Sequence, residues 1–376
     1  MNQDLTELIE ASRFYGKDKT FVIAGGGNTS FKNENYIWIK ASGVALETID
    51  EHGFVCLSRE KLKIVSSKKY SHDAVLREAE VKADLTNAIV SSGNNRPSVE
   101  TSMHEIIDYK YVIHTHPAKV NAVMCSNNAE STCSELFGEQ SLFIPYTDPG
   151  YILFKKVETE IAQFTSKFGK APQIIFLENH GVFVAADTVS DIHILYHSII
   201  EKINGRIKET LPIDEPKPFD SPIIDQIGEL HPGFKTFVAR GIESSLIHHF
   251  AKDYDGFKCA DTAFTPDDIV YCKAHYLFIP SRIDEHEQIE AASSLIAGYM
   301  NAYGYFPKVL VLEGKGVIAV EDSVKSVLNV LEVYSNILKI SFLSGNFGGP
   351  KFMTNDQIEF IDNWEVENYR RKMAKS

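Results

Sequence analysis

The sequence predicts a layered α/β protein built from two domains. Segments with the β-branched and aromatic composition of strands alternate along the chain with segments of helical periodicity. A stretch rich in proline and acidic residues interrupts this pattern at residues 209–222. The chain has 376 residues, of which 44% are hydrophobic, so it is long enough to bury two cores. Strands that alternate with helices favour helices layered on a sheet.

The elements before residue 209 follow from composition and period. Apolar residues recur at helical intervals in "DLTELIEASRFYG", which predicts a helix that ends at Gly16. Strands are predicted for "YIWIKASG", "GFVCLS" and "KYVIHTH", and "QIIFLENHGVFVA" predicts two short strands joined at residues 179–181. The main helices are predicted in "SVETSMHEII" and "TVSDIHILYHSIIEKINGRIK".

The segment "ETLPIDEPKPFDSP" is predicted to be a domain boundary, because its four prolines cannot continue a helix or a central strand. We therefore expect one domain at residues 1–210 and a second at 225–376. In the second, "PKVLVLEGKGVIAVEDSVKSVLNVLEVYSNILKI" resembles "PQIIFLENHGVFVAADTVSDIHILYHSIIEKINGRI" of the first. Aligned, Gly316 falls on Gly181 and Lys315 on His180. The likeness indicates either a duplication or only the common form of a strand–turn–strand–helix unit.

Composition excludes several classes of function. The formal net charge of −13 disfavours binding to nucleic acid or to anionic membranes. The N-terminus lacks the pattern of a signal peptide, and no apolar run reaches the roughly 18 residues of a membrane span, so we expect a cytoplasmic protein. Five cysteines without a C-x-x-C pair argue against a disulfide framework and a thiolate metal cluster.

Histidines provide the strongest chemical signal. Alternation along a strand sends His114 and His116 of "HTHP" to the same face, where they either hold one ion or belong to a polar sheet face. His180 lies at a glycine-flanked turn and adds a third imidazole. Three neutral imidazoles leave a coordination position of zinc open, as a catalytic Lewis-acid site requires.

Other candidate residues are less specific. Glu100 follows a Pro-Ser turn and opens a helix, where it is either a proton carrier or an ordinary helix-terminal charge. "AGGGNTSFK" matches neither of the common nucleotide-binding patterns and indicates an anion-binding turn or only a turn. His104 is either a neighbour of the site or a packing residue. His193 and His197, four residues apart on a helix, are interpreted as a surface pair.

Six motifs taken in order, "GGGNTSFK", "IKASG", "RPSVET", "HTHP", "PYTDPG" and "LENHGVFV", resemble the class II aldolase/adducin family over residues 10–205. The chain is most similar to the aldolase part of bifunctional rhamnulose-1-phosphate aldolase/lactaldehyde dehydrogenase proteins, with weaker likeness downstream in "TPDDIVYCK" and "IDNWEVENYRRK". The resemblance implies a three-layer α/β/α sandwich around a mixed, largely antiparallel sheet, with a second, smaller α/β domain that is a degenerate repeat without metal. It implies zinc and, since the dehydrogenase part would begin where this sequence stops, no NAD.

The resemblance also implies roles for single residues. His114, His116 and His180 match the zinc ligands, and Glu100 matches the carboxylate that moves a proton at the substrate carbon. Tyr146 matches a tyrosine that reaches a neighbouring subunit's site and protonates the aldehyde, which implies a ring-like homo-oligomer, such as a tetramer. The positions that hold the substrate phosphate are matched by Asn28, Ser42, Gly43 and Ser98. Val99 departs from the family, because many sugar-phosphate aldolases have a second serine there.

The function implied is metal-dependent retro-aldol cleavage of a ketose 1-phosphate. Its substrate would be a deoxyhexulose 1-phosphate such as rhamnulose 1-phosphate, and its products dihydroxyacetone phosphate and an aldehyde. The same family also implies a metal-dependent epimerase, dehydratase or decarboxylase as the alternative. A non-catalytic module like that of adducin is a third reading, which the three histidines and Glu100 disfavour.

Overall fold

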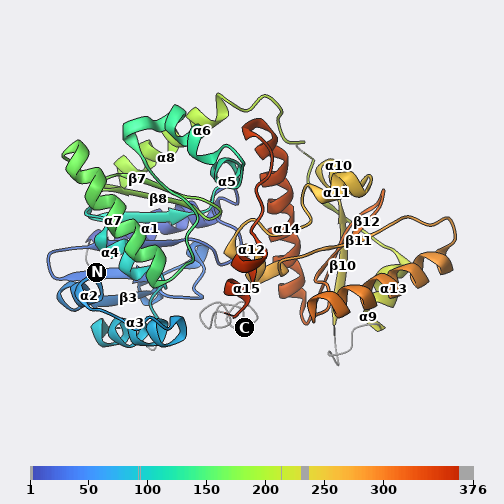
Figure 1. Cartoon of the computed structure of the whole chain (residues 1–376), viewed down its shortest axis with the longest axis horizontal. Helices are drawn as coiled ribbons and strands as arrows, with labels where there is room; N and C mark the ends of the chain where they lie inside the picture. The colour runs from blue at the N-terminus through green and yellow to red at the C-terminus, as the bar shows by residue number, and fades with distance from the viewer. Residues whose placement is uncertain (1–2, 92, 94, 213, 230–236, 364–376) are drawn as a thin grey trace. The chain divides into compact units, whose positions relative to one another are not determined.

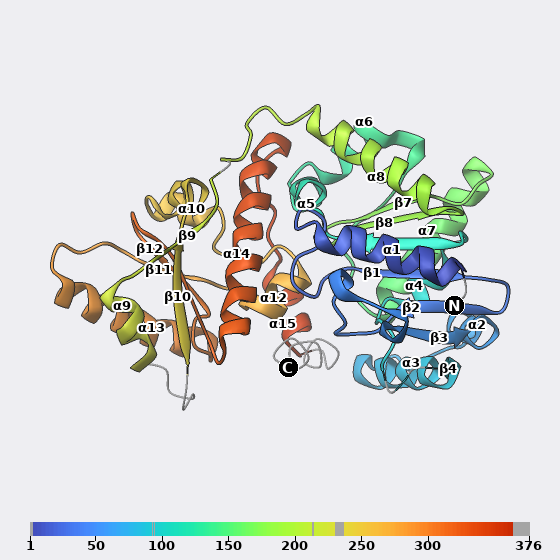
Figure 2. The ribbon, with the colours of Figure 1, turned by 180° about the vertical axis from the view of Figure 1, so that it is seen from behind.

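A computed structural model describes residues 3–91, 93, 95–212, 214–229 and 237–363 (Figures 1 and 2). The chain divides into two compact units. Unit 1 comprises Met1–Met124 with Asn128–Arg206, and unit 2 comprises Cys125–Asn127 with Ile207–Ser376. The larger part of the "IDNWEVENYRRK" segment, from residue 364 on, lies outside the described residues.

Unit 1 is built on a mixed sheet with the strand order β4-β3-β2-β1-β5-β8-β7-β6. Only β6 and β7 pair in parallel, and each other neighbouring pair is antiparallel. This confirms a mixed, largely antiparallel sheet. The strands are β1 (Asn28–Lys32), β2 (Tyr36–Lys40), β3 (Phe54–Ser58), β4 (Ile89–Ser91), β5 (Tyr111–Thr115), β6 (Leu142–Ile144), β7 (Ile174–Leu177) and β8 (Gly181–Ala186).

Helices cover both faces of this sheet, so unit 1 is the three-layer sandwich that was expected (Figures 1 and 2). The core on one face joins β5–β8 to α2, α3, α4 and α7, and α1 and α8 contact β1 and β8 on the other. The helices are α1 (Gln3–Lys17), α2 (Arg59–Ser67), α3 (Ala74–Ala88), α4 (Thr101–Ile106), α5 (Ala118–Met124), α6 (Ala129–Phe137), α7 (Tyr151–Phe168) and α8 (Val189–Asn204). Short 3₁₀ turns are η1 (Leu46–Thr48), η2 (Glu51–Gly53) and η3 (Gly138–Gln140).

Two details of unit 1 differ from the prediction. Helix α1 continues one residue past Gly16, whose missing side chain serves packing: a Cβ there would lie 2.4 Å from the backbone nitrogen of Glu47 in η1. The "NTSFK" part of the glycine-rich segment is not a turn but strand β1, whose backbone pairs with β2 and β5. An anion-binding turn stays a prediction, which concerns only residues 25–27.

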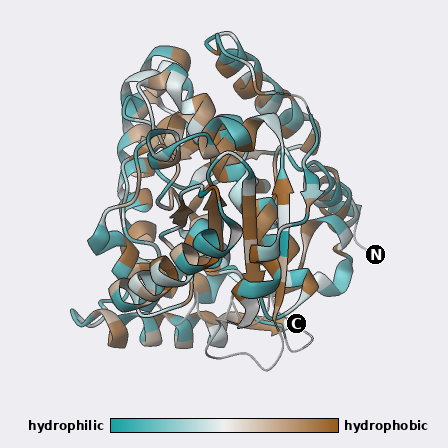
Figure 3. Cartoon of the chain, turned by 90° about the vertical axis from the view of Figure 1, so that its right-hand side faces the viewer, coloured by the Kyte–Doolittle hydropathy of each residue, from teal (hydrophilic) through white to brown (hydrophobic). Residues whose placement is uncertain are grey.

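Unit 2 contains a five-stranded sheet with the order β11-β12-β13-β10-β9. Its strands are β9 (Lys217–Phe219), β10 (Val238–Glu243), β11 (Leu277–Ile279), β12 (Val309–Leu312) and β13 (Gly316–Glu321). Its helices are α9 (Pro222–Glu229), α10 (Ser245–Ala251), α11 (Tyr254–Lys258), α12 (Pro266–Cys272), α13 (Glu285–Tyr303), α14 (Val324–Ser344) and α15 (Asn355–Asn363), with a 3₁₀ turn η4 (Gly345–Phe347). The strands are largely brown, and therefore apolar, in Figure 3.

Strand β9 and the start of α9 lie inside the segment predicted to be a linker. Pro218 has no backbone N–H to donate, which would disrupt a central strand. Strand β9, however, lies at the sheet edge and, among the described strands, pairs only with β10. An edge strand tolerates such a proline, so the proline-rich segment is partly ordered structure.

The repeat predicted from the sequence is present as β7-β8-α8 in unit 1 and β12-β13-α14 in unit 2. Leu177 pairs with Gly181, and Leu312 pairs with Gly316, in the same antiparallel register. A parallel strand flanks each hairpin on one side, β6 on β7 and β11 on β12, and an antiparallel strand flanks it on the other, β5 on β8 and β10 on β13.

Two sequence features have direct structural counterparts. The five cysteines carry free thiols: Cys259 is exposed and the other four are buried. Within the described ranges, no helix combines the length and the apolar character needed to cross a membrane.

We expect Gly16→Ala and Gly298→Ala to change stability in opposite directions, although both glycines lie in helices. A Cβ at residue 16 would overlap the backbone of η1, and overpacking costs about 1–3 kcal/mol, more than the gain of up to about 1 kcal/mol in helix propensity. A Cβ at residue 298 of α13 meets nothing within 4 Å, so only the gain remains. Calorimetric unfolding should give a lower midpoint for Gly16→Ala and a slightly higher one for Gly298→Ala; equal shifts would contradict the packing argument.

Candidate metal centre

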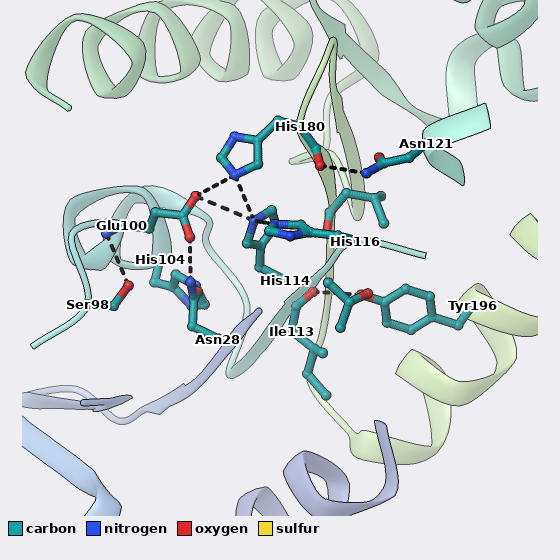
Figure 4. Close-up of polar contacts among 12 residues, drawn as sticks. Asn28, Ser98, Glu100, His104, Ile113, His114, His116, Asn121, His180 and Tyr196 are labelled. Carbon is teal, nitrogen blue, oxygen red and sulfur yellow. Dashed lines mark hydrogen bonds and ion pairs between the residues drawn. The ribbon is translucent and has the colours of Figure 1, made fainter. Parts of the chain in front are cut away.

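Three imidazoles converge at the end of the β5–β8 pair. His114 lies on β5, His116 follows the last residue of that strand, and His180 lies in the turn between β7 and β8. The Nε2 atom of His114 is 2.9 Å from that of His116 and 3.4 Å from that of His180 (Figure 4). Candidate ligand atoms of all three lie within 4.8 Å of one another. The fold thus joins residues that are 66 positions apart in sequence.

The backbone around the histidines fixes their orientation. His114 is fully buried, and its Nδ1 donates to the carbonyl of Val182 on β8 at 3.0 Å, which leaves the lone pair on Nε2. Gly181 lets the strands approach closely, because a Cβ there would lie 2.5 Å from the His116 ring. Asn179 lies in the turn itself with a φ of 53°, and Asn121 donates to the carbonyl of His180 at 3.0 Å.

These donors fit a divalent transition metal. Nitrogen ligands at about 2.0–2.1 Å from a tetrahedral zinc ion lie about 3.3–3.4 Å from one another. The separation between His114 and His180 meets that value, and the separation between His114 and His116 is somewhat shorter. The bond from Nδ1 of His114 to a carbonyl is also the usual second interaction of a metal-binding imidazole.

Glu100 brings a carboxylate to the same point. It is the N-cap residue of α4, only 7% exposed, and its Oε1 lies 3.4 Å from Nε2 of His114 and 3.5 Å from Nε2 of His180 (Figure 4). Among the described residues Oε1 has no hydrogen-bond donor, whereas Oε2 accepts from the side-chain amide of Asn28. One carboxylate oxygen therefore faces the space between the imidazoles and the other is held by the protein.

Comparison with known proteins identifies the fold that carries this centre. The sequence model of the Class II Aldolase and Adducin N-terminal domain matches residues 6–201. The chain belongs to this family. A class II aldolase domain from Thermoplasma acidophilum is 26% identical, with a TM-score of 0.46, and the match covers 55% of this chain and 94% of that one. An L-fuculose 1-phosphate aldolase from Glaciozyma antarctica is 14% identical, with a TM-score of 0.37, covering 56% and 76% of the two chains.

A longer relative spans both units. An uncharacterized oxidoreductase of Bacillus subtilis, YuxG, is 23% identical over 98% of this chain. The chain spans 58% of the length of that relative.

In this class II aldolase fold, three of the four residues predicted to hold a substrate phosphate, Ser42, Gly43 and Ser98, lie on two adjacent segments, and the fourth, Asn28, lies on β1. The N–H of Ser42 donates to the carbonyl of Arg96 at 2.9 Å, and the N–H of Ser98 donates to the carbonyl of Lys40 at 3.2 Å. Gly43 has a φ of 85° and is exposed. Ser98 Oγ accepts the N–H of Glu100 at 3.2 Å, so this segment leads directly to the catalytic carboxylate predicted by the sequence.

Tyr146 lies just after β6. Its backbone N–H donates to the carboxylate of Glu178 at 2.9 Å, and its hydroxyl is buried within unit 1 beside the carboxylate of Asp148. Burial raises the pKa of this phenol.

The structure also identifies three residues behind the site: Ser30, Lys32 and His104. Of these, the sequence indicated only His104, and it left the role of that residue open. His104 is fully buried and contacts Asn28 and Ser30, and the Nζ of Lys32 donates to the carbonyls of His104, Glu105 and Ile107. Burial lowers the pKa of Lys32 to about 8. At neutral pH the side chain is therefore still a charged ammonium, which donates to the three carbonyls. One sequence signal could have indicated these residues: Asn28, Ser30 and Lys32 are polar at every second position of a strand, so they share one face of it.

His193 and His197 lie outside this centre. Nδ1 of His193 shares a hydrogen bond of 2.8 Å with the hydroxyl of Tyr15, and its ring packs on Phe14. His197 is exposed. Within the described part of the chain, the grouping of potential ligands contains neither of them.

We expect the protein to bind one divalent ion per chain through these histidines. Removing an imidazole by His114→Ala or His180→Ala deletes a ligand and should weaken binding by more than the roughly 10–100-fold that loss of an outer partner causes. His197→Ala, the control, should bind like the unaltered protein. Calorimetric titration with Zn²⁺ and metal analysis measure this; undiminished binding by His114→Ala would refute the assignment.

Proposed function

We propose that the protein is a metal-dependent aldolase that cleaves a ketose 1-phosphate, of the deoxyhexulose type such as rhamnulose 1-phosphate, to dihydroxyacetone phosphate and an aldehyde. The observation that carries this proposal is the buried carboxylate of Glu100 beside three converging imidazoles, 3.4–3.5 Å from two of them. Membership of the class II aldolase family supports it. The reaction is redox-neutral and needs no nicotinamide cofactor.

His114, His116 and His180 would hold the ion, with zinc the proposed metal. When bound, the ion supplies positive charge beside the substrate oxygens on which negative charge develops as the carbon–carbon bond breaks. Glu100 then returns a proton to the substrate carbon through Oε1, the oxygen that faces the imidazoles. Ser42, Gly43 and Ser98, with Asn28, form the proposed grip on the phosphate.

Tyr146 is proposed to act in the site of a neighbouring subunit, as the acid that protonates the departing aldehyde. The likeness of "PYTDPG" to the corresponding motif of the family supports this role. This role requires a homo-oligomer, and we propose a ring with rotational symmetry.

One observation favours a second candidate function. Val99 cannot donate the hydrogen bond that a serine would offer to a phosphate, although the neighbouring Ser98 is in place. The same metal centre could then serve an epimerase, dehydratase or decarboxylase whose substrate carries no terminal phosphate.

Unit 2 is proposed to be a degenerate copy that holds no metal. Phe183 and Ile318 occupy the same place in the repeat and pair with His114 and Gly241, respectively. Phe219 pairs with Gly241, as Asn28 pairs with His114, and its ring would lie 2.7–2.8 Å from a Cβ at residue 241 or 316. An aromatic ring thus fills the region where unit 1 places imidazoles. A metal ion held wholly by residues after 225 would contradict this proposal.

The decisive assay offers zinc-loaded protein rhamnulose, fuculose and related ketose 1-phosphates and measures release of dihydroxyacetone phosphate in a coupled reaction. We expect release from at least one sugar and its loss on chelation. No release from protein with a demonstrated full metal content would reject the aldolase proposal and direct attention to the alternatives, with Val99→Ser as the first variant to test.

Glu100→Gln should retain metal but lose turnover, because an amide of the same shape cannot carry the proton. We expect a fall of about 10²–10⁴-fold in kcat, the usual contribution of a general acid or base, with one ion still bound per chain. Near-full activity of this variant would remove Glu100 from the mechanism.

A further inference from the structure

Strand β1 and helix α4 are joined by side chains that alternate along the strand. Asn28, Ser30 and Lys32 share one face of β1, which is the face of His114 in the paired strand β5. Opposite them, Glu100 and His104 are four residues apart on α4 and so lie on one side of it. Asn28 contacts Glu100 and His104, Ser30 contacts His104, and Lys32 binds the carbonyls at the end of the helix.

The donor and acceptor capacity of each group fixes the direction of the hydrogen bonds that link Glu100, Asn28, His104 and Ser30. A carboxylate only accepts, so the amide nitrogen of Asn28 donates to Oε2 of Glu100. The amide oxygen of Asn28 therefore faces Nε2 of His104, which must carry the hydrogen. A neutral imidazole then accepts at Nδ1, so the hydroxyl of Ser30 donates to it at 2.7 Å.

We infer that His104 is a positioning residue, which fixes the amide orientation of Asn28 and through it the carboxylate of Glu100. The inference rests on the proposed role of Glu100. It adds to Asn28 a task beyond the proposed phosphate grip: one amide hydrogen of Asn28 is committed to Glu100, and its oxygen is committed to His104.

His104 can influence a substrate only through its neighbours. It is fully buried, lies between β1 and the aromatic ring of Phe183, and has no exposed atom to offer a ligand. Burial, followed by the electrostatic influence of His114 and of Lys32, lowers the pKa of His104 well below its usual range, in agreement with a neutral ring. Lys32 holds the other end of the short helix at 2.5 Å from the carbonyl of His104, so Glu100 and His104 cannot shift along β1 independently.

Two substitutions of the same residue separate positioning from packing. His104→Gln keeps a side-chain N–H for Asn28 and an acceptor for Ser30, whereas His104→Leu fills similar space and offers neither. With a substrate from the coupled assay, we expect His104→Leu to lower kcat about 10–100-fold, the usual effect of losing an outer hydrogen-bond partner, with metal content unchanged. His104→Gln should recover most of that loss, and deuterium incorporation from solvent into dihydroxyacetone phosphate should follow the same order.

A second measurement does not depend on activity. Nitrogen-15 NMR of the imidazoles, in metal-free and zinc-loaded protein, should find His104 neutral at pH 7 with hydrogen on Nε2. A hydrogen on Nδ1, or a charged ring at pH 7, would overturn the inference even if the enzyme is an aldolase. Equal kcat of His104→Leu and the unaltered enzyme would overturn it as well. If no ketose phosphate is cleaved by metal-loaded protein, the proposed function fails, and the NMR result alone decides whether the hydrogen-bond chain exists.

Discussion

The constraint on which unit 1 depends is the burial of electron-pair donors at one point. The Nε2 atoms of His114 and His180 lie 3.4 and 3.5 Å from Oε1 of Glu100, and Nε2 of His116 lies 2.9 Å from that of His114. Such groups lose the solvation of water and gain little from one another, so they must be held by other bonds. The ladder between β5 and β8, the close approach at Gly181 and the amide of Asn28 supply those bonds.

The two units show that the backbone alone does not make this centre. Both have the hairpin with the same register, and in both a carboxylate, Glu178 or Glu313, accepts a backbone N–H from the residue two places after the parallel strand. What differs is the side chains at the strand ends. Gly241 and Lys315 stand where unit 1 has His114 and His180, and Phe219 fills the space. The fold therefore tolerates exchange of the chemistry for packing.

Local patterns were sufficient to predict the α/β class, the strands around the histidines and the location of Glu100 at a helix start. These features depend on period and on turn chemistry, which neighbouring residues determine. The chain of hydrogen bonds behind Glu100 could not be predicted, because Asn28 and Glu100 are 72 positions apart and come together only where α4 and its N-cap residue lie against β1. Strand β9 was missed for a similar reason: Pro218 signals a break, and only its place at a sheet edge permits a strand.

The polar core between β1 and α4 is better explained by geometry than by stability. Lys32, Ser30, Asn28 and His104 are buried, and each exchanges bonds with water for bonds within the protein, a net gain of only about 0.5–1.5 kcal/mol per bond. Well-packed apolar side chains of the same volume would often stabilise such a core equally well. What they could not do is fix one orientation of an amide and one rotamer of a carboxylate. The network thus favours a role in directing Glu100 toward the histidines, since the amide of Asn28 binds Oε2 and leaves Oε1 turned toward His114 and His180.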